Sequence, residues 1–145
     1  MPRFVVPCLA ALFAALLAGP CLAGAEVTGD DAAEIRAVIH RQIDAFRRDD
    51  AREAFALAAP AVQKTFGTPE KFLDVVRVAY RAVYRPASVF FLGLQVVDGD
   101  VVQRLRVTDR SGRVWAAYYA MQRQKDGSWR ASGCYLAPPV RTIEA

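Results

Sequence analysis

The sequence VFFLGLQVVDGDVVQRLRVT, residues 89–108, decides the fold of this chain. Its centre, Asp98-Gly99, is the strongest short signal for a two-residue hairpin turn, because that turn needs residues that tolerate a left-handed backbone. Apolar and polar residues alternate on both sides of the turn, which is typical of strands that pack one face on a core. The turn predicts three cross-strand pairs on the core face: Val96 with Val101, Leu92 with Leu105, and Phe90 with Val107.

Two further turn signals extend this hairpin into a four-stranded meander. Arg110-Ser111-Gly112 and Lys125-Asp126-Gly127 are each typical of a three-residue loop with glycine in the left-handed position. A two-residue turn at the first of them would slip the register by one residue and expose the aromatic face. The three-residue loops place seven residues on the core face, with Gly133 opposite Tyr119: Trp115, Ala117, Tyr119, Met121, Trp129, Ala131 and Gly133.

The sequence before the hairpins, residues 30–85, has helical periodicity. We predict a second helix over residues 51–59, capped by Asp50 and ended by Pro60, and a short helical piece over residues 62–66. A third main helix runs from Thr68-Pro69 to Arg85-Pro86. The first helix has the clearest apolar stripe: Ile35, Val38, Ile39, Ile43 and Phe46.

Helices followed by strands favour an α+β fold, in which three to four N-terminal helices pack on one face of a four-stranded antiparallel meander. A sheet of this size, strongly twisted and packed around a long first helix, tends to leave a cavity at one end. We therefore expect a cone-like domain over residues 26–145 with a concave pocket.

The first 25 residues have the three regions of a secretory signal peptide. Arg3 is the positive charge, residues 9–18 are an unbroken apolar run, and Ala23-Gly24-Ala25 has the small-x-small pattern of a cleavage site. The apolar run is about half the length of a membrane-spanning helix. We expect cleavage after Ala25 and export to the periplasm or the medium. Lipoprotein processing at Cys21 is the alternative, which Pro20 disfavours.

Composition excludes several classes of function. Without its leader the chain keeps one cysteine, Cys134, and one histidine, His40, so it has no internal disulfide and no cluster of metal ligands. The net charge of +4 falls by one when Arg3 is removed, and no basic run with interleaved aromatic residues is present. We expect no metal, no cofactor, no nucleic acid and no membrane span.

Polar residues that interrupt the apolar faces are the candidates for a binding site. Gln42 follows the stripe of the first helix, Gln103 lies on the core face of the second strand, and Tyr80 and Tyr119 end in hydroxyl groups. A buried amide without a hydrogen bond costs about 1–3 kcal/mol. We predict that these four line a small-molecule pocket together with Trp115. The alternative is that they satisfy one another inside an ordinary core.

No catalytic set emerges from the sequence. His40 falls on the wet flank of the first helix, and the aspartates fall at caps and turns. The outward sheet face is predicted to carry an apolar patch around two arginines, which usually marks a contact surface. This favours a homodimer through the sheet, or partial cover by the chain's own termini. The patch consists of Val89, Phe91, Val102, Arg104 and Arg106.

The chain resembles a bacterial family of small exported proteins, domain of unknown function 4864. The phrases that carry the resemblance span most of the chain: Ile39-x-x-Gln42-Ile43-x-Ala45-Phe46-x-x-Asp49-Asp50, Ala54-Phe55, Ala59-Pro60, Phe66-Gly67-Thr68-Pro69-x-x-Phe72, Tyr80, Gln103, Asp109-x-x-Gly112, Tyr119 and Asp126-Gly127-x-Trp129-Arg130-x-x-Gly133-Cys134. Ala131 stands where a larger aliphatic residue is usual.

Such proteins are similar to the nuclear-transport-factor-2-like, or SnoaL-like, group. That resemblance implies a cone-shaped fold with a pocket, and it implies no activity, because the fold hosts enzymes, ligand binders and dimerisation modules. The inward Asp or Asp–His pair of the group's enzymes has no matching position here.

We therefore interpret the chain as a non-enzymatic exported module that binds a small apolar or amphipathic ligand or a protein partner. A small isomerase or hydro-lyase is the runner-up, with Tyr80 or Tyr119 donating a hydrogen bond to a developing oxyanion. A third alternative is a partner-binding domain whose cavity is filled by its own side chains.

Overall fold

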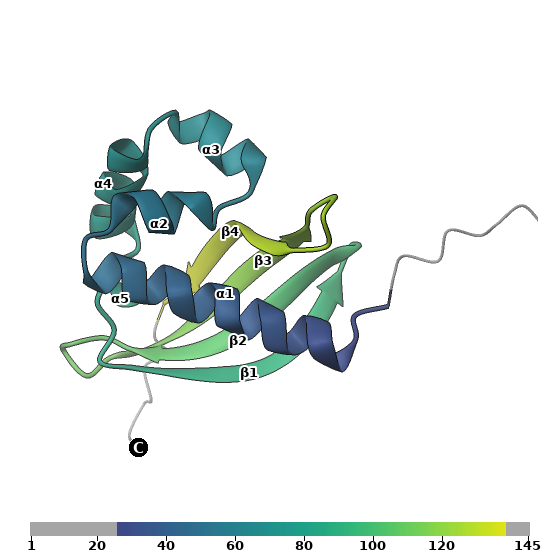
Figure 1. Cartoon of the computed structure of the whole chain (residues 1–145). Helices are drawn as coiled ribbons and strands as arrows, with labels where there is room; N and C mark the ends of the chain where they lie inside the picture. The colour runs from purple at the N-terminus through teal and green to yellow at the C-terminus, as the bar shows by residue number, and fades with distance from the viewer. Residues whose placement is uncertain (1–25, 139–145) are drawn as a thin grey trace, which may run out of the picture.

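Five helices pack against one four-stranded antiparallel sheet in the computed structural model, which describes residues 26–138 (Figure 1). This confirms the predicted α+β class. The strands follow one another in the order β1-β2-β3-β4. The elements are α1 (Gly29–Arg47), α2 (Ala51–Ala56), α3 (Pro60–Phe66), α4 (Pro69–Ala79), α5 (Arg81–Tyr84), β1 (Ser88–Val97), β2 (Asp100–Thr108), β3 (Val114–Arg123) and β4 (Trp129–Ala137).

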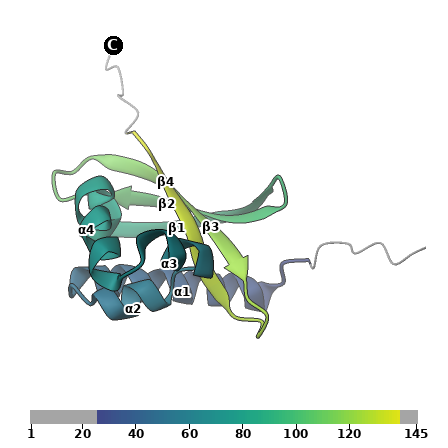
Figure 2. The same cartoon turned by 90° about the horizontal axis from the view of Figure 1, so that it is seen from above.

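The helices gather on one face of the sheet, and α1 lies across the strands (Figure 2). Within residues 26–138 no helix has both the length and the apolar character to cross a membrane. The predicted signal peptide, residues 1–25, lies outside the described residues.

Side-chain caps define where the helices begin. Thr28 starts α1 with a capping box, and Asp50 and Thr68 accept from the backbone N–H groups at the starts of α2 and α4. The predicted second helix is shorter than expected, because it ends at Ala56. Pro60 does not merely end it but opens α3, where a missing N–H costs nothing.

The predicted third helix is broken at Tyr80 into α4 and α5. Tyr80 has φ −125° and ψ 43°, outside the helical region. The break has a packing reason, since the two halves belong to different parts of the core. Helix α4 buries Phe72 and Val76 in a cluster with α1 and α2, whereas α5 buries Val83 against the sheet. One straight helix would not serve both clusters.

Strand β1 contains a bulge, and the predicted register fails beyond it. Val96 pairs with Val101 as predicted, but the register shifts between Phe91 and Leu94, so that Val89 faces Val107. Four predicted placements are therefore reversed. Phe90 and Leu92, expected in the core, are exposed, and Val89 and Phe91, expected on the outward face, pack against the core. An extra residue in one strand turns all side chains beyond it to the other face.

The side chain of Gln103 supplies a hydrogen-bond donor to the bulge of β1. This side chain is 1% exposed. Its Nε2 donates to the carbonyl oxygens of Leu92 at 2.6 Å and Arg104 at 2.9 Å. Leu92 lies in the bulged segment, which has no partner in the ladder. The buried amide is thus the donor that the displaced strand needs.

The second hairpin forms as predicted, whereas the third deviates. Gly112 has φ 84°, and the register that follows buries Ala117 and Tyr119. In the third hairpin Ala131 pairs with Met121 as the three-residue loop requires, but a second bulge follows. Gly133 is consequently not opposite Tyr119. That position belongs to Cys134, whose side chain reaches the core.

We predict that Gln103→Leu lowers the free energy of unfolding by about 1–3 kcal/mol, because the Leu92 carbonyl would lose its buried donor. Chemical denaturation measures this difference. Gln122→Leu, the same change at an exposed position of β3, is the control and should shift stability by less than about 0.5 kcal/mol. Equal effects of the two substitutions would contradict the role given to Gln103.

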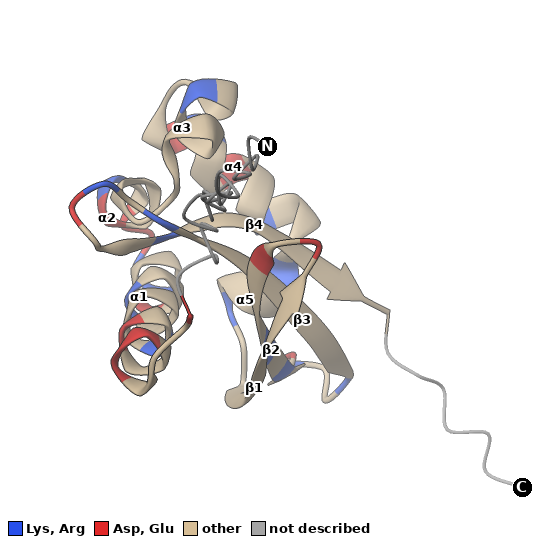
Figure 3. Cartoon of the chain, turned by 90° about the vertical axis from the view of Figure 1, so that its right-hand side faces the viewer, with Lys and Arg blue, Asp and Glu red and all other residues tan. Residues whose placement is uncertain are grey.

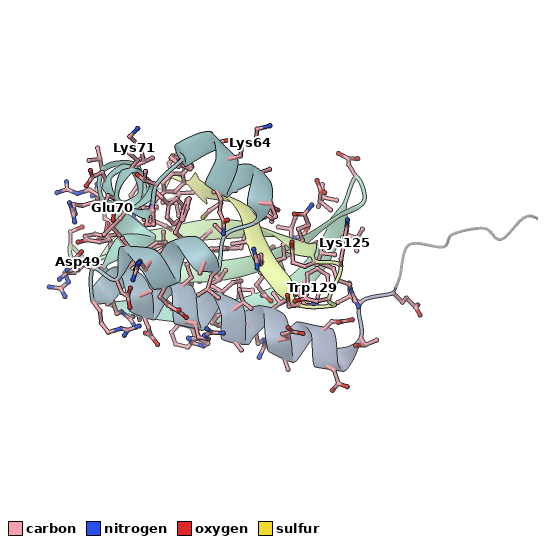
Figure 4. All side chains as sticks on the ribbon, turned by 45° about the horizontal axis from the view of Figure 1, so that its top comes forward. Asp49, Lys64, Glu70, Lys71, Lys125 and Trp129 are labelled. Atoms are coloured by element: carbon pink, nitrogen blue, oxygen red, sulfur yellow. The ribbon has the colours of Figure 1, made fainter. Side chains whose placement is uncertain are left out.

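Asp31 ties the first turn of α1 to the β3–β4 hairpin. Its carboxylate accepts from Thr28 within the capping box, from Arg123 Nη2 at 2.7 Å, and from Trp129 Nε1 at 3.2 Å. Figure 4 shows Trp129 beside the beginning of α1. The backbone N–H of Thr28, and then the indole of Trp129, hold the pKa of Asp31 well below its ordinary value of 3.8.

The lowered pKa of Asp31 predicts a pH-dependent contribution to stability. Because the folded state favours the charged carboxylate, the contribution is complete above the ordinary pKa and is lost as the pH falls toward the folded pKa. The difference in unfolding free energy between the parent and Asp31→Asn should be constant from about pH 6 to 8 and should shrink below about pH 4. Asp30→Asn, at an exposed neighbour, should not reproduce this profile; if it does, the contacts of Asp31 are not the cause.

Candidate functional site

The connection between α2 and α3 is fixed to the outer edge of β4. The Ala131 N–H donates to the Leu57 carbonyl at 2.9 Å, and the Ala59 N–H donates to the Ala131 carbonyl at 2.8 Å. Ala58 thereby forms an isolated parallel bridge with Ala131. The bridge lies next to the β4 bulge, and α3 starts immediately after it.

Helix α3 buries none of its residues fully, and a side chain holds it in place. Gln63 Nε2 donates to the carbonyls of Phe55 at 2.9 Å and Ala58 at 3.1 Å, in the last turn of α2 and just after it. The helix is thereby held beside α4 and β4.

A pocket of about 320 Å³ lies between the two core clusters. Its volume is at the lower end of the range for small-molecule sites. Its walls come from α1, the connection between α2 and α3, helices α3, α4 and α5, and the last two strands. The lining consists of Gln42, Phe46, Ala58, Ala61, Val62, Thr65, Phe66, Phe72, Val75, Val76, Tyr80, Val83, Tyr119, Ala131, Ser132, Gly133 and Cys134.

The pocket has a closed end and an open end. Gln42 of α1 and Tyr119 of β3 are each 2% exposed and form the closed end. Thr65 of α3 is exposed, and Val75 of α4 is 38% exposed. The mouth of the pocket therefore lies between α3 and α4.

Gln42 points inward and joins two helices. Its Nε2 donates to the carbonyl of Ala54, in α2, at 3.0 Å. The same side chain lines the pocket. The amide thus has a structural role on its nitrogen side, and its oxygen has no hydrogen-bond partner among residues 26–138.

Tyr119 and Cys134 face each other across β3 and β4 and are both electrically neutral at ordinary pH. Burial raises the pKa of the Tyr119 hydroxyl well above 10.0, with a smaller effect from Cys134. Burial likewise raises the pKa of the Cys134 thiol to about 12. The thiol is therefore not the activated thiolate of a reactive cysteine.

The structure brings three of the five predicted lining residues together and separates the other two. Gln42, Tyr80 and Tyr119 line the pocket. Gln103 instead donates a hydrogen bond to the Leu92 carbonyl in the β1 bulge. Trp115 donates its Nε1–H to Asp109 Oδ2 at 2.9 Å, in the β2–β3 turn.

Most of the mouth was missed by sequence reasoning. The residues of α3 showed no buried stripe, and Cys134 entered the lining only because β4 is bulged. A glycine inside a strand is a signal of a bulge, and both bulged strands contain one, Gly93 and Gly133.

Charged side chains lie outside the pocket. Lys64 of α3 and Lys71 of α4 point away from the body of the molecule in Figure 4. Helices α1 and α2 carry charges of both signs (Figure 3), including the pair Arg41–Glu53 at 2.6 Å. His40 is exposed and stacks on Phe91 at 4.6 Å. In the part of the chain that the structure describes, no group of His, Cys, Asp and Glu could hold a metal ion.

Fold and pocket together define a class: an α+β protein whose helices cover one face of an antiparallel sheet and enclose with it an uncharged, mostly apolar pocket. The chain belongs to the family described as Domain of unknown function (DUF4864), whose model matches residues 28–143. The match includes every residue of the pocket lining. No curated protein and no solved structure matches the chain.

Proposed function

We propose that this protein binds a small apolar or amphipathic molecule in the pocket between α3, α4 and the sheet. The observation that carries this proposal is the pocket itself: about 320 Å³ of space behind a mouth, walled by aromatic and aliphatic side chains. A domain that filled its cavity with its own side chains would close this space, because interiors are otherwise packed densely.

The lining supports binding better than catalysis. Among the described residues, the pocket is lined by no Asp, Glu, His, Lys or Arg. An isomerase or hydro-lyase needs a base with a suitable pKa. The Tyr119 hydroxyl can donate a hydrogen bond, as an oxyanion site requires, but nothing beside it removes a proton from a substrate.

We further propose that the protein is exported and that its fold is nuclear-transport-factor-2-like. The signal-peptide pattern of residues 1–25 supports export. A long first helix lying across a curved four-stranded sheet, with a pocket at one end, supports the fold assignment.

A bulky side chain inside the pocket should block binding. Val76 lines the pocket and is 5% exposed, whereas Val78 of the same helix is 77% exposed. We expect Val76→Trp to weaken the binding of the neutral fluorescent probe N-phenylnaphthylamine about tenfold. The indole ring would occupy space in the pocket, and the probe would lose buried contact equivalent to roughly two methylene groups, at about 0.8 kcal/mol each. Fluorescence titration measures the affinity.

The matched control is Val78→Trp, which adds the same side chain outside the pocket and should leave the affinity unchanged. Circular dichroism verifies that both variants fold. If the parent does not bind the probe, or if both variants bind it as the parent does, the pocket is not a binding site.

A second proposal concerns the outward face of the sheet, which we propose is the interface of a homodimer. With the β1 bulge the most exposed aromatic residues of this face are Phe90, 55% exposed, and Tyr135, 64% exposed. The Arg106 guanidinium lies 4.9 Å from the centre of the Phe90 ring. Arginine beside an exposed aromatic ring suits a self-complementary surface, since each copy offers both partners of a cation–π contact.

The dimer proposal predicts a concentration-dependent mass. Sedimentation equilibrium should show dimers of the parent protein, and Tyr135→Glu should weaken association at least about tenfold by placing an unpaired charge in the interface. Val78→Glu, an equally exposed site on α4, should have no effect. A parent protein that stays monomeric at high concentration would refute the proposal.

A further inference from the structure

We propose that the pocket selects an uncharged amphiphile and takes it polar end first. A hydroxyl or amide group of the ligand lies at the closed end against Tyr119 and Gln42, and the apolar body extends toward the mouth between α3 and α4. This inference rests on the proposed binding function and adds the class of ligand and its orientation.

The closed end offers one hydrogen-bond donor and one acceptor that the protein does not use. Within residues 26–138, the Tyr119 hydroxyl and the Gln42 amide oxygen make no hydrogen bond. Neither is sealed inside the protein, because Arg85 Nε is the one fully enclosed side-chain nitrogen or oxygen without a partner in that range. Both side chains line the pocket, so a ligand inside it can reach the two atoms. Buried polar groups are nearly always hydrogen-bonded, and a ligand group that both accepts and donates would satisfy the pair.

The closed end rejects charge. A carboxylate or an ammonium group would lose its hydration there without meeting an opposite charge, since the lining has no Asp, Glu, His, Lys or Arg among the described residues. Burial keeps Tyr119 in its neutral, donating form, because it raises the pKa of the hydroxyl. The thiol of Cys134 is neutral for the same reason. An alcohol or amide group fits this environment, because each both accepts and donates a hydrogen bond.

The walls toward the mouth are apolar and suit a short hydrocarbon body. Phe66 of α3 and Phe72 of α4 meet edge to face at 5.4 Å, and Phe46 of α1 lies 6.0 Å from Phe72. The volume of about 320 Å³ is at the lower end of the range for small-molecule sites, which suits a short ligand.

Four probes of equal chain length test the inference by displacement of N-phenylnaphthylamine at neutral pH: octanol, octanoate, octylamine and octane. We expect octanol to bind most tightly and the two charged probes at least about a hundredfold more weakly. Tyr119→Phe should weaken octanol binding about fivefold to tenfold and leave octane binding unchanged, because one hydrogen bond is lost.

Tyr118→Phe is the matched control, since it removes the neighbouring hydroxyl, on the other face of β3, and should leave all affinities as in the parent. Thermal unfolding verifies that Tyr119→Phe folds. If octanoate or octylamine binds as tightly as octanol, or if Tyr119→Phe leaves octanol binding unchanged, the inference is overturned while the pocket function stands. If the parent binds no probe at all, or if Val76→Trp weakens the binding of none of the probes, the pocket function fails and the inference with it.

Discussion

The two backbone hydrogen bonds of Ala131 are the constraint on which the helical half of the structure depends. They hold residues 57–59 on the edge of β4, so that α2 must approach the sheet and α3 must leave it at the same point. The edge of a sheet otherwise exposes unpaired donors and acceptors. Here the bridge between Ala58 and Ala131 covers that edge locally. It also fixes where α3 begins relative to the strands, because α3 starts two residues after Ala58.

The position of α3 explains why a pocket exists. One core cluster lies between α1, α5 and the sheet, and the other lies between α1, α2 and α4. The break at Tyr80 lets the chain contribute to both, but the two clusters do not merge completely. The remaining space is covered by a short helix without fully buried residues, which Gln63 holds in place.

The chemistry of the molecule is divided in the same way. Asp31 lies in the capping box of α1 and Asp109 lies in the β2–β3 turn. Hydrogen bonds from N–H and hydroxyl groups stabilise their charged forms and lower their pKa values. The pocket holds the opposite kind of group, a neutral hydroxyl and a neutral thiol in surroundings without charge. Ionic groups in this protein therefore support the fold, and neutral polar groups remain for a ligand.

The sequence by itself determined the class of fold, the starts of α2 and α4, the two-residue first turn and the inward position of Gln42, because caps, turn residues and apolar periodicity act over a few residues. It did not determine the faces of β1 before Gly93, the partner of Tyr119 or the break at Tyr80. Those depended on bulges and on the competition between two core clusters, which are contacts between residues far apart in the chain. Tertiary packing thus directs the Gln103 side chain to the bulge of β1, whereas Gln42 and Tyr119 line the pocket.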